Sequence, residues 1–328
     1  MDSLTQAALG AVIGDIGLQK KYGKKALLIG AAFGTLPDLD VIQNLFIDPV
    51  SQLDWHRSYS HSIFFSIIIA PIVYYLSKKD SKWAWTVFWI LLTHTLLDCL
   101  TTWGTKLFWP FSNYAVAIQS MFIIDPLYTI WLLIPITLRL FNVKKTYFVT
   151  GIIISSIYAI LGIFNQSIIN NRWESYYQTQ NISVKNINSK TTAFNNVLWA
   201  TMAETDTHFL IGYSSILANT ISPVYAIEKK QNWPQNLNQD PKIQTLIRIT
   251  KSTYTLTHNE KQKIVTMHDW RFGQSEGWET GNGNAIFNYI IDYSTDPIQI
   301  TTYSPRDISY NKVFKYYPQF LKGNFQIN

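Results

Sequence analysis

Histidines and aspartates stand at short spacings between the apolar stretches of the N-terminal half. Asp54-Trp-His-Arg-Ser-Tyr-Ser-His61 lies between Pro37-Asp-Leu-Asp40 and His94-Thr-Leu-Leu-Asp98. Ionisable groups among apolar segments are costly unless something pairs with them. Imidazoles and carboxylates are the ligands of zinc-type and manganese-type sites. The pattern therefore predicts a divalent metal ion, with zinc expected first and manganese as the alternative.

The candidate ligands lie on three kinds of local structure. His94 and Asp98 are four residues apart and share one face of a helix. Asp38 and Asp40 follow a proline, which favours a broken helix with both carboxylates turned inward. His56 and His61 suit a loop that folds over a site. Each motif alone also fits a plain structural role, as a polar pair, an Asx-turn or a solvated loop, and the set as a whole favours the metal: Asp38, Asp40, His56, His61, His94 and Asp98.

Arg57, between two candidate ligands, is the predicted catalytic residue. Its planar guanidinium matches the geometry of a phosphate group. Asp54 lies close in sequence and offers a structural alternative, an ion pair within the loop.

The elements that position these residues are apolar segments long enough to cross a bilayer, or nearly so. A full span needs about 20 apolar residues. The candidate segments are 4–18, 26–47, 62–77, 83–100, 121–141 and 147–168, of which the first two could instead be re-entrant or interfacial. Residues 171–328 are rich in Asn, Thr, Ser, Gln and Tyr. We therefore expect a mainly α-helical polytopic membrane domain over 1–170 and a small β-rich (α+β) domain over 171–328.

Lysine and arginine are unevenly distributed between the predicted loops. The loops after the first, third and fifth segments are rich in Lys, whereas the loops after the second and fourth carry only Arg57 and Lys106. The positive-inside rule places the Lys-rich loops in the cytoplasm. The candidate ligands then meet near the external face of the cell membrane, and residues 171–328 are extracytoplasmic. Asp15 falls near the cytoplasmic end, where we expect a helix-end or interhelix contact.

Several other sequence features refine these expectations. The net charge of +6 is explained by the loop lysines, so no nucleic-acid partner is expected. Cys99 is the single cysteine, which excludes an intrachain disulfide. No basic leader precedes the apolar N-terminus, so no cleavable signal peptide is expected. Aromatic residues near the segment ends are typical of interfacial anchors: Trp55, Trp83, Trp85, Trp103, Trp109 and Tyr114.

The C-terminal half has strand-like patterns bounded by polar turns. The predicted strands are 196–203, 208–213, 264–270 and 285–291, with a turn at 278–284 and a helix around 240–249. His208, His258 and His268 share no ligand spacing, and we expect them to be surface or core histidines.

The N-terminal half resembles the YdjM-type family of membrane-bound metal-dependent hydrolases. The matching stretches cover most of residues 1–130 in order, and include Met1–Gly10, Gly34–Asp40, His56–Ser62, His94–Gly104, Phe108–Phe111 and Ile124–Tyr128. The resemblance implies a metal site on the six His and Asp residues named above. The family pattern has His where Gln6 stands and Glu where Asp15 stands, which leaves Gln6 outside the expected ligand set.

We therefore expect a membrane-bound metal-dependent hydrolase that acts at the outer membrane surface on a lipid or lipid-linked phosphoester. An ion or solute transporter could line its pathway with the same His and Asp residues. A pathway should continue to the cytoplasmic face, where only Asp15 lies, and this favours the enzyme. A third alternative, a non-catalytic anchor for the outer domain, leaves the polar cluster unexplained. The sequence does not determine the oligomeric state.

Overall fold

The computed structural model describes residues 1–141, 144–234, 237–275, 283–305 and 310–325. The chain forms two compact units. The first contains residues 1–45, 55–164 and 191–196, and the second contains residues 46–54, 165–190 and 197–328. The predicted boundary near residue 170 falls within helix α7, which contributes residues to both units.

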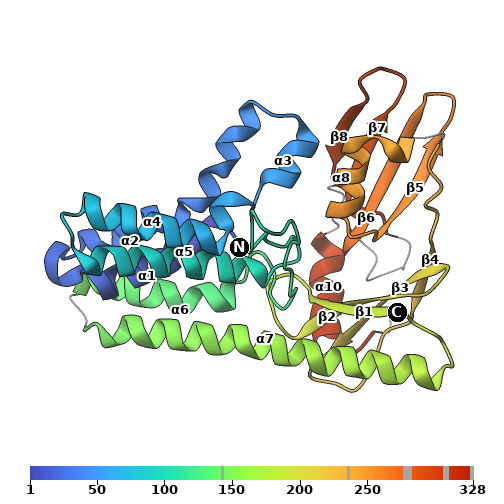
Figure 1. Ribbon diagram of the computed structural model, residues 1–328. Coiled ribbons are helices and arrows are strands. Elements are labelled where there is room, and N and C mark those ends of the chain that lie inside the picture. The colour runs from blue at the N-terminus through green and yellow to red at the C-terminus, as the bar shows by residue number, and fades with distance from the viewer. Residues whose placement is uncertain (142–143, 235–236, 276–282, 306–309, 326–328) are drawn as a thin grey trace. The chain divides into compact units, whose positions relative to one another are not determined.

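The first unit is helical, as Figure 1 shows. Its elements are α1 (Ser3–Tyr22), α2 (Lys25–Thr35), the 3-10 helix η1 (Pro37–Leu45), η2 (Tyr59–His61), α4 (Ile63–Leu76), α5 (Ser81–Cys99), α6 (Pro126–Leu138), η3 (Arg139–Phe141) and the first part of α7 (Thr146–Thr179). The short helix α3 (Pro49–Trp55) lies mainly in the second unit. Each predicted apolar segment therefore corresponds to a helix or to a broken pair of helices.

One predicted segment forms the broken helix that its proline favours, and another begins its helix later than predicted. The segment predicted over 26–47 bends by 52° between α2 and η1, because Pro37 cannot supply the backbone N–H that a continuous helix needs. The segment predicted over 121–141 begins its helix only at Pro126. There Asp125 caps the N-terminus by accepting from the backbone N–H groups of Leu127 and Tyr128.

Helices α1 and α2 pack closely through two pairs of glycines. A Cβ on Gly10 would lie 2.3 Å from the carbonyl oxygen of Gly30, and a Cβ on Gly34 would lie 2.6 Å from that of Gln6. Gly14 approaches the backbone of Ala26 in the same way. Small residues four apart let two helix backbones approach closely, as in membrane proteins. The contact holds the N-terminus of α1 against the C-terminal end of α2.

Within the described part of the chain, α7 alone is a single helix long and apolar enough to cross a membrane. The number rises to three if two broken pairs each count as one span, namely Lys25–Thr35 with Pro37–Leu45 and Pro49–His61 with Ile63–Leu76. Helix α6 is apolar but shorter. The helical first unit is confirmed, whereas the full multi-pass arrangement stays a prediction.

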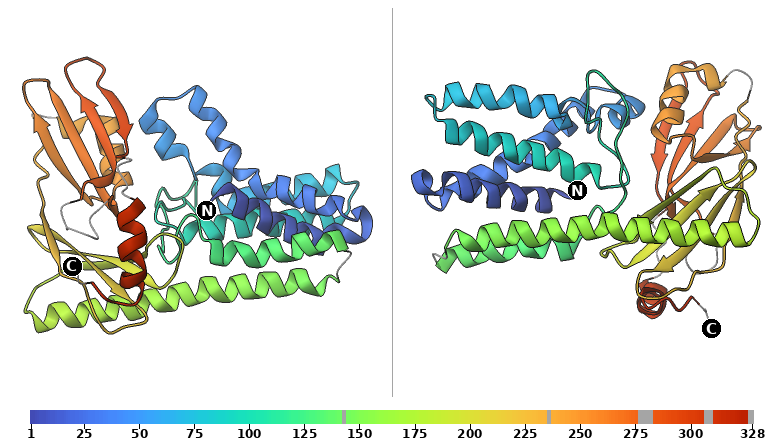
Figure 2. Two further views of the ribbon diagram at one scale, coloured as in Figure 1. Left: turned by 180° about the vertical axis from the view of Figure 1, so that it is seen from behind. Right: turned by 60° about the horizontal axis from the view of Figure 1, so that its bottom comes forward.

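The second unit contains two four-stranded antiparallel sheets, drawn from further directions in Figure 2. Sheet 1 has the order β1 (Asn186–Thr191), β2 (Leu198–Glu204), β3 (His208–Ser215), β4 (Tyr225–Glu228). Sheet 2 has the order β5 (Tyr254–Asn259), β6 (Ile264–Gln274), β7 (Ala285–Asp292), β8 (Gln299–Tyr303). The helical elements are η4 (Leu237–Gln239), α8 (Pro241–Ile249) and α10 (Tyr310–Leu321). The β-rich prediction is confirmed, including the predicted strands and the helix near 240–249; most of the predicted turn at 278–284 lies outside the described residues.

Helices cover the sheets through buried apolar residues. Phe320 of α10 packs on one face of sheet 1, against Leu198 and Phe209. Trp173 of α7 packs on the opposite face, where a Cβ on Gly212 would lie 2.2 Å from its ring. Helix α8 packs on sheet 2 through Ile243 and Leu246, together with Val50 of α3. The last contact explains why residues 46–54 belong to the second unit although they lie early in the sequence.

Sheet 2 contains a buried ion pair next to a lysine from sheet 1. Arg271 Nη2 donates to Asp269 Oδ2 across 2.7 Å, and Lys190 Nζ donates to the backbone carbonyl of Arg271 across 2.6 Å. Burial lowers the pKa of Lys190 to about 7, because the neutral amine loses less hydration than the ammonium ion.

Candidate metal centre

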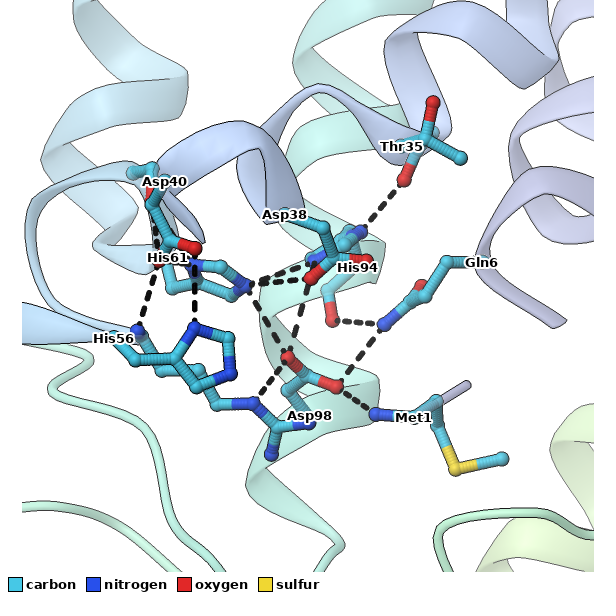
Figure 3. Close-up of polar contacts among 12 residues, drawn as sticks. Met1, Gln6, Thr35, Asp38, Asp40, His56, His61, His94 and Asp98 are labelled. Carbon is cyan, nitrogen blue, oxygen red and sulfur yellow. Dashed lines mark hydrogen bonds and ion pairs between the residues drawn. The ribbon is translucent and has the colours of Figure 1, made fainter. Parts of the chain in front are cut away.

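Two histidines and two aspartates from three elements of the first unit converge on one point. They are Asp38 of η1, His61 of η2, and His94 and Asp98 of α5, and one ligand atom from each lies within 4.8 Å of all the others. Figure 3 shows the four side chains directed toward one another. Among the residues that the structure describes, no other group of this kind is present. The sequence analysis named all four residues as candidate ligands.

The two imidazoles face each other through their Nε2 atoms, which are 3.1 Å apart. Asp38 Oδ1 lies 3.3 Å from Nε2 of His61 and 3.6 Å from Nε2 of His94. Asp98 Oδ2 lies 3.4 Å and 3.8 Å from the same two nitrogens. The spacing of His94 and Asp98 on α5 thus places both on one helix face, as predicted.

The protonation of His94 follows from its outward nitrogen. Nδ1 lies 2.7 Å from the backbone carbonyl oxygen of Gly34. A carbonyl oxygen can only accept, so Nδ1 carries the hydrogen and Nε2 of the neutral ring presents a lone pair to the centre.

His61 is oriented in a similar way by Asp40. Its Nδ1 lies 3.0 Å from Ser60 Oγ and 3.5 Å from Asp40 Oδ2, while Ser60 Oγ donates to the same carboxylate oxygen across 3.3 Å. These partners place a hydrogen on Nδ1 of His61, so in the neutral ring Nε2 carries a lone pair that faces the centre. A carboxylate behind a ligating histidine is the usual orienting partner in metal sites.

The arrangement fits a divalent cation. Two imidazole lone pairs and two carboxylate oxygens repel one another unless a positive charge lies among them, and one proton bridges only two of the four atoms. At the Zn–N distances found in proteins, a tetrahedral zinc ion holds two imidazole nitrogens roughly 3.3 Å apart. The separation of 3.1 Å between the two Nε2 atoms is close to this value. Two imidazoles with two carboxylates suit zinc, and manganese accepts the same donors.

Asp98 is the residue of the centre that contacts the neighbouring positive and polar groups. The α-amino group of Met1 and the side-chain amide of Gln6 both donate to its Oδ1. Arg57 Nε lies 3.1 Å from Oδ2, yet within the described chain neither of these buried atoms makes a hydrogen bond of good geometry. The lone pairs of Oδ2 therefore stay available to a cation, while Oδ1 fixes the orientation of the carboxylate.

Arg57, the predicted catalytic residue, is buried beside the cluster. Its Nη1 donates to Thr101 Oγ1 across 2.9 Å, and its backbone N–H donates to Asp40 Oδ2 across 3.0 Å. Its φ of 59° lies in the left-handed region, which non-glycine residues seldom adopt. The alternative pairing with Asp54 does not occur, because Asp54 Oδ1 binds Arg248 across 2.8 Å. Arg57 thus points its guanidinium to the carboxylate of Asp98, one of the four converging residues.

His56 and Asp40 form the layer behind the four converging residues. His56 Nδ1 lies 3.0 Å from Asp40 Oδ1, and its ring centroid lies 6.0 Å from that of His61. Asp40 thereby contacts donors from His56, Arg57, Ser60 and His61, so the loop folds around this carboxylate as predicted. Neither Asp40 nor His56 is among the residues whose ligand atoms converge.

The sequence analysis missed the groups that orient the ligands. The backbone carbonyl of Gly34, the hydroxyl of Ser60 and the hydroxyl of Thr101 carry no ligand signature in the sequence. The spacing of Gly10, Gly14, Gly30 and Gly34 was an available signal, because it indicates a close α1–α2 contact that brings Gly34 to the site.

Besides Asp40, two buried aspartates of the first unit lie outside the cluster, namely Asp15 and Asp125. Asp15 accepts from Arg139 Nε across 3.1 Å, which confirms the expected interhelix contact. Asp125 accepts from the hydroxyl of Tyr158 across 2.9 Å and caps α6. Each therefore has a protein partner, as buried charges require.

Comparisons with known proteins agree with this description of the first unit. A family model described as "YdjM inner membrane protein" matches residues 1–169. The inner membrane protein YbcI of Escherichia coli (strain K12) is 30% identical over 118 residues, which cover 34% of this chain and 68% of YbcI. No solved structure is significantly similar to the chain.

Proposed function

The chain belongs to the YdjM family of inner membrane proteins, and we propose that it is a multi-pass, metal-dependent hydrolase that cleaves a lipid or lipid-linked phosphoester at the outer surface of the cell membrane. The observation that carries the proposal is the convergence of four ligand atoms within 4.8 Å of one another, from Asp38, His61, His94 and Asp98. The Nε2 atoms of the two imidazoles are 3.1 Å apart. A divalent cation would lie among all four atoms, whereas a proton shared between the imidazoles joins only two of them.

The residues of the centre have separate roles in this proposal. Asp38, His61, His94 and Asp98 bind the cation, and a divalent cation there would act as a Lewis acid and lower the pKa of a coordinated water. Asp40 holds His61 in the ligating tautomer, and the Gly34 carbonyl does the same for His94. His56 is the more exposed imidazole of the site, with 31% of its side chain accessible. It is therefore placed to exchange a proton with a substrate or with water.

Arg57 supports a phosphoester over an acyl ester. Its Nε and Nη1 atoms face Asp98 and Thr101, and Nη2 donates no hydrogen bond to another described residue. A guanidinium held beside a metal can bind a phosphoryl oxygen and stabilise negative charge as it develops. An acyl ester requires an oxyanion site but no guanidinium.

The distribution of lysine supports the proposed location at the outer surface. On α1 the centre lies at the N-terminal end, near Gln6, whereas Lys20 and Lys21 lie in the last turn. On α5 the centre lies at the C-terminal end, whereas Lys82 lies in the first turn. The positive-inside rule puts the lysine ends in the cytoplasm and the centre outside. A transporter would need polar groups between these two ends, yet residues 7–14 of α1 are all apolar or glycine.

The first test measures metal in the purified full-length protein, together with the variants His61→Ala and Asp38→Asn. Asp125→Asn is the control, because Asp125 is a buried aspartate of the first unit that lies outside the centre. We expect about one equivalent of zinc or manganese in the wild type and in the control, and none in the two ligand variants. Wild-type protein that neither retains nor rebinds a divalent metal would contradict the proposal.

The second test measures hydrolysis by metal-loaded protein in mixed micelles, with separate assays for phosphate or phospho-headgroup release and for fatty-acid release. Removal of one transition-state donor typically lowers turnover by about 100-fold or more. We expect Arg57→Ala to show such a loss with its metal retained, and Arg57→Lys to recover only part of the rate. Fatty-acid release alone would refute the phosphoester, and full activity of Arg57→Ala would remove Arg57 from the mechanism.

A further inference from the structure

The segment between α5 and α6 exposes aromatic side chains in an almost uncharged stretch. Residues 101–118 contain one charged residue, Lys106, which is buried. The exposed fraction is 49% for Phe108, 80% for Phe111 and 66% for Tyr114. Such side chains are expensive to expose to water, and a contiguous exposed apolar surface marks a site of interaction.

Backbone hydrogen bonds fix this segment to the metal centre. Lys106 N–H donates to the carbonyl of Arg57 across 3.0 Å, and Ile118 N–H donates to the carbonyl of Cys99, next to Asp98, across 2.7 Å. Thr105 and Val116 form a bridge that closes the segment on itself. The segment and the candidate metal centre are therefore held together, so wherever the segment lies relative to a membrane, the centre lies close to the same level.

The aromatic surface continues in two directions. Trp109 packs against Trp55 and Tyr59, which flank His56 and His61 in sequence, with ring centroids 6.4 Å and 6.3 Å apart. Phe111 packs on Phe64 of α4 at 5.0 Å. Helix α4 in turn exposes Ile67, Ile68 and Ile72. The segment thus joins the surroundings of the metal centre to the apolar outer surface of a helix.

We propose that residues 101–118 lie in the headgroup layer of the bilayer, with Phe108, Phe111 and Tyr114 inserted among the lipids, so that the metal centre opens at headgroup depth. Aromatic side chains without charge are typical of membrane interfaces. A lipid surface also explains the continuity with α4, which a soluble partner would not. If the proposed hydrolase function holds, its substrate is a membrane phospholipid that reaches the centre from within the bilayer.

Nitroxide labels test the position of the segment directly. The variants are Phe111→Cys and Tyr114→Cys, with Ile157→Cys on α7 as the membrane reference and Leu217→Cys in the second unit as the water reference. All four native side chains are exposed, and Cys99 is buried and should stay unlabelled. The full-length protein is reconstituted in phosphatidylcholine vesicles, and the accessibility of each label to oxygen and to a water-soluble nickel relaxant is measured. We expect the ratio of oxygen to nickel accessibility at positions 111 and 114 to lie between the ratios at the two reference positions. Accessibility equal to that at position 217 would overturn the proposal.

A second measurement addresses the substrate. Phe108→Ser with Phe111→Ser should retain metal, lose at least about tenfold in hydrolysis of vesicle phospholipid, and keep its rate on a soluble aryl phosphodiester. Phe141→Ser, which changes an aromatic residue of similar exposure (76%) outside the segment, is the control. Equal losses on both substrates would exclude the lipid-specific role. Absence of hydrolysis in the wild type, with the labels at interfacial depth, would refute the hydrolase function and leave the interfacial segment intact.

Discussion

His94 on α5 donates its Nδ1 hydrogen to the backbone carbonyl of Gly34 at the end of α2, across 2.7 Å. This bond orients an imidazole of the candidate metal centre, and it depends on a backbone atom. Gly34 is itself held by its close approach to Gln6 and Gly10 of α1. The packing of two helices therefore controls the orientation of a residue on a third.

Replacement of Gly34 should weaken metal binding without removal of a ligand. In Gly34→Ala the new Cβ would lie 2.6 Å from the Gln6 carbonyl oxygen, so α2 must shift and carry the Gly34 carbonyl away from His94. Loss of an orienting partner typically costs 10- to 100-fold in metal affinity. We expect a loss in this range, measured by competition with a chelator.

Gly14→Ala is the matched control for this experiment. Its Cβ would lie 2.6 Å from the Ala26 carbonyl oxygen, so it disturbs the same helix contact to a similar extent at a point remote from His94. Metal affinity should be close to that of the wild type. Equal losses in Gly14→Ala and Gly34→Ala would show that helix packing in general, and not the Gly34 carbonyl, determines affinity.

Asp40 should act as an orienting residue for His61. Asp40→Asn replaces one acceptor oxygen with a donor that faces the N–H and O–H groups of the loop. We expect metal affinity to fall about 10- to 100-fold, whereas Asp38→Asn should abolish binding. A cobalt-substituted sample gives a second readout, because its visible spectrum reports ligand geometry. Loss of binding equal to that of Asp38→Asn would instead make Asp40 a ligand.

Lys190 should make the stability of the second unit depend on pH. Burial lowers its pKa to about 7 in the folded protein, while an unfolded lysine titrates near about 10.4. Between these values the unfolded chain binds more protons, so this residue makes stability rise with pH, by at most about 1.4 kcal/mol per pH unit. Lys190→Met removes the effect.

Thermal unfolding of the full-length protein, followed by near-ultraviolet circular dichroism, checks this prediction. The advantage in Tm of Lys190→Met over the wild type should be larger at pH 6.5 than at pH 9.5. Lys185→Met is the control, because Lys185 is exposed and paired with Asp206. A difference between Lys190→Met and the wild type that does not change with pH would show that Lys190 is neutral or charged in both states alike.

The sequence predicts the local elements of this protein well because strong local signals specify them. Short runs of β-branched and aromatic residues, bounded by polar turns, indicate β3 and β7 in 208–213 and 285–291. Asp240 followed by Pro241 marks the start of α8. Strand β4 (Tyr225–Glu228) has only four residues and few buried side chains, so its sequence carries little strand signal. It exists because β3 pairs with it.

The residue types of the candidate site could be predicted from the sequence. Which of these residues converge and which orient the others could not. The His and Asp residues stand out because charge is rare in apolar segments. Their division into converging and orienting residues depends on tertiary contacts, such as the placement of the Asp40 carboxylate among donors from residues 56–61. The pairing of Arg57 with Asp98 instead of Asp54 likewise depends on contacts between segments distant in sequence.

The assignment of residues 46–54 to the second unit has a consequence for biosynthesis. Val50 packs with Ile243 and Leu246, so a segment made early must wait until nearly 200 later residues have left the ribosome. The chain passes between the units after residues 45, 54, 164, 190 and 196. Neither unit is one continuous stretch of chain, so each includes residues that are synthesised after part of the other. Chains that stop short of α8 keep this apolar segment uncovered, which gives chaperones and proteases a means to distinguish them from finished protein.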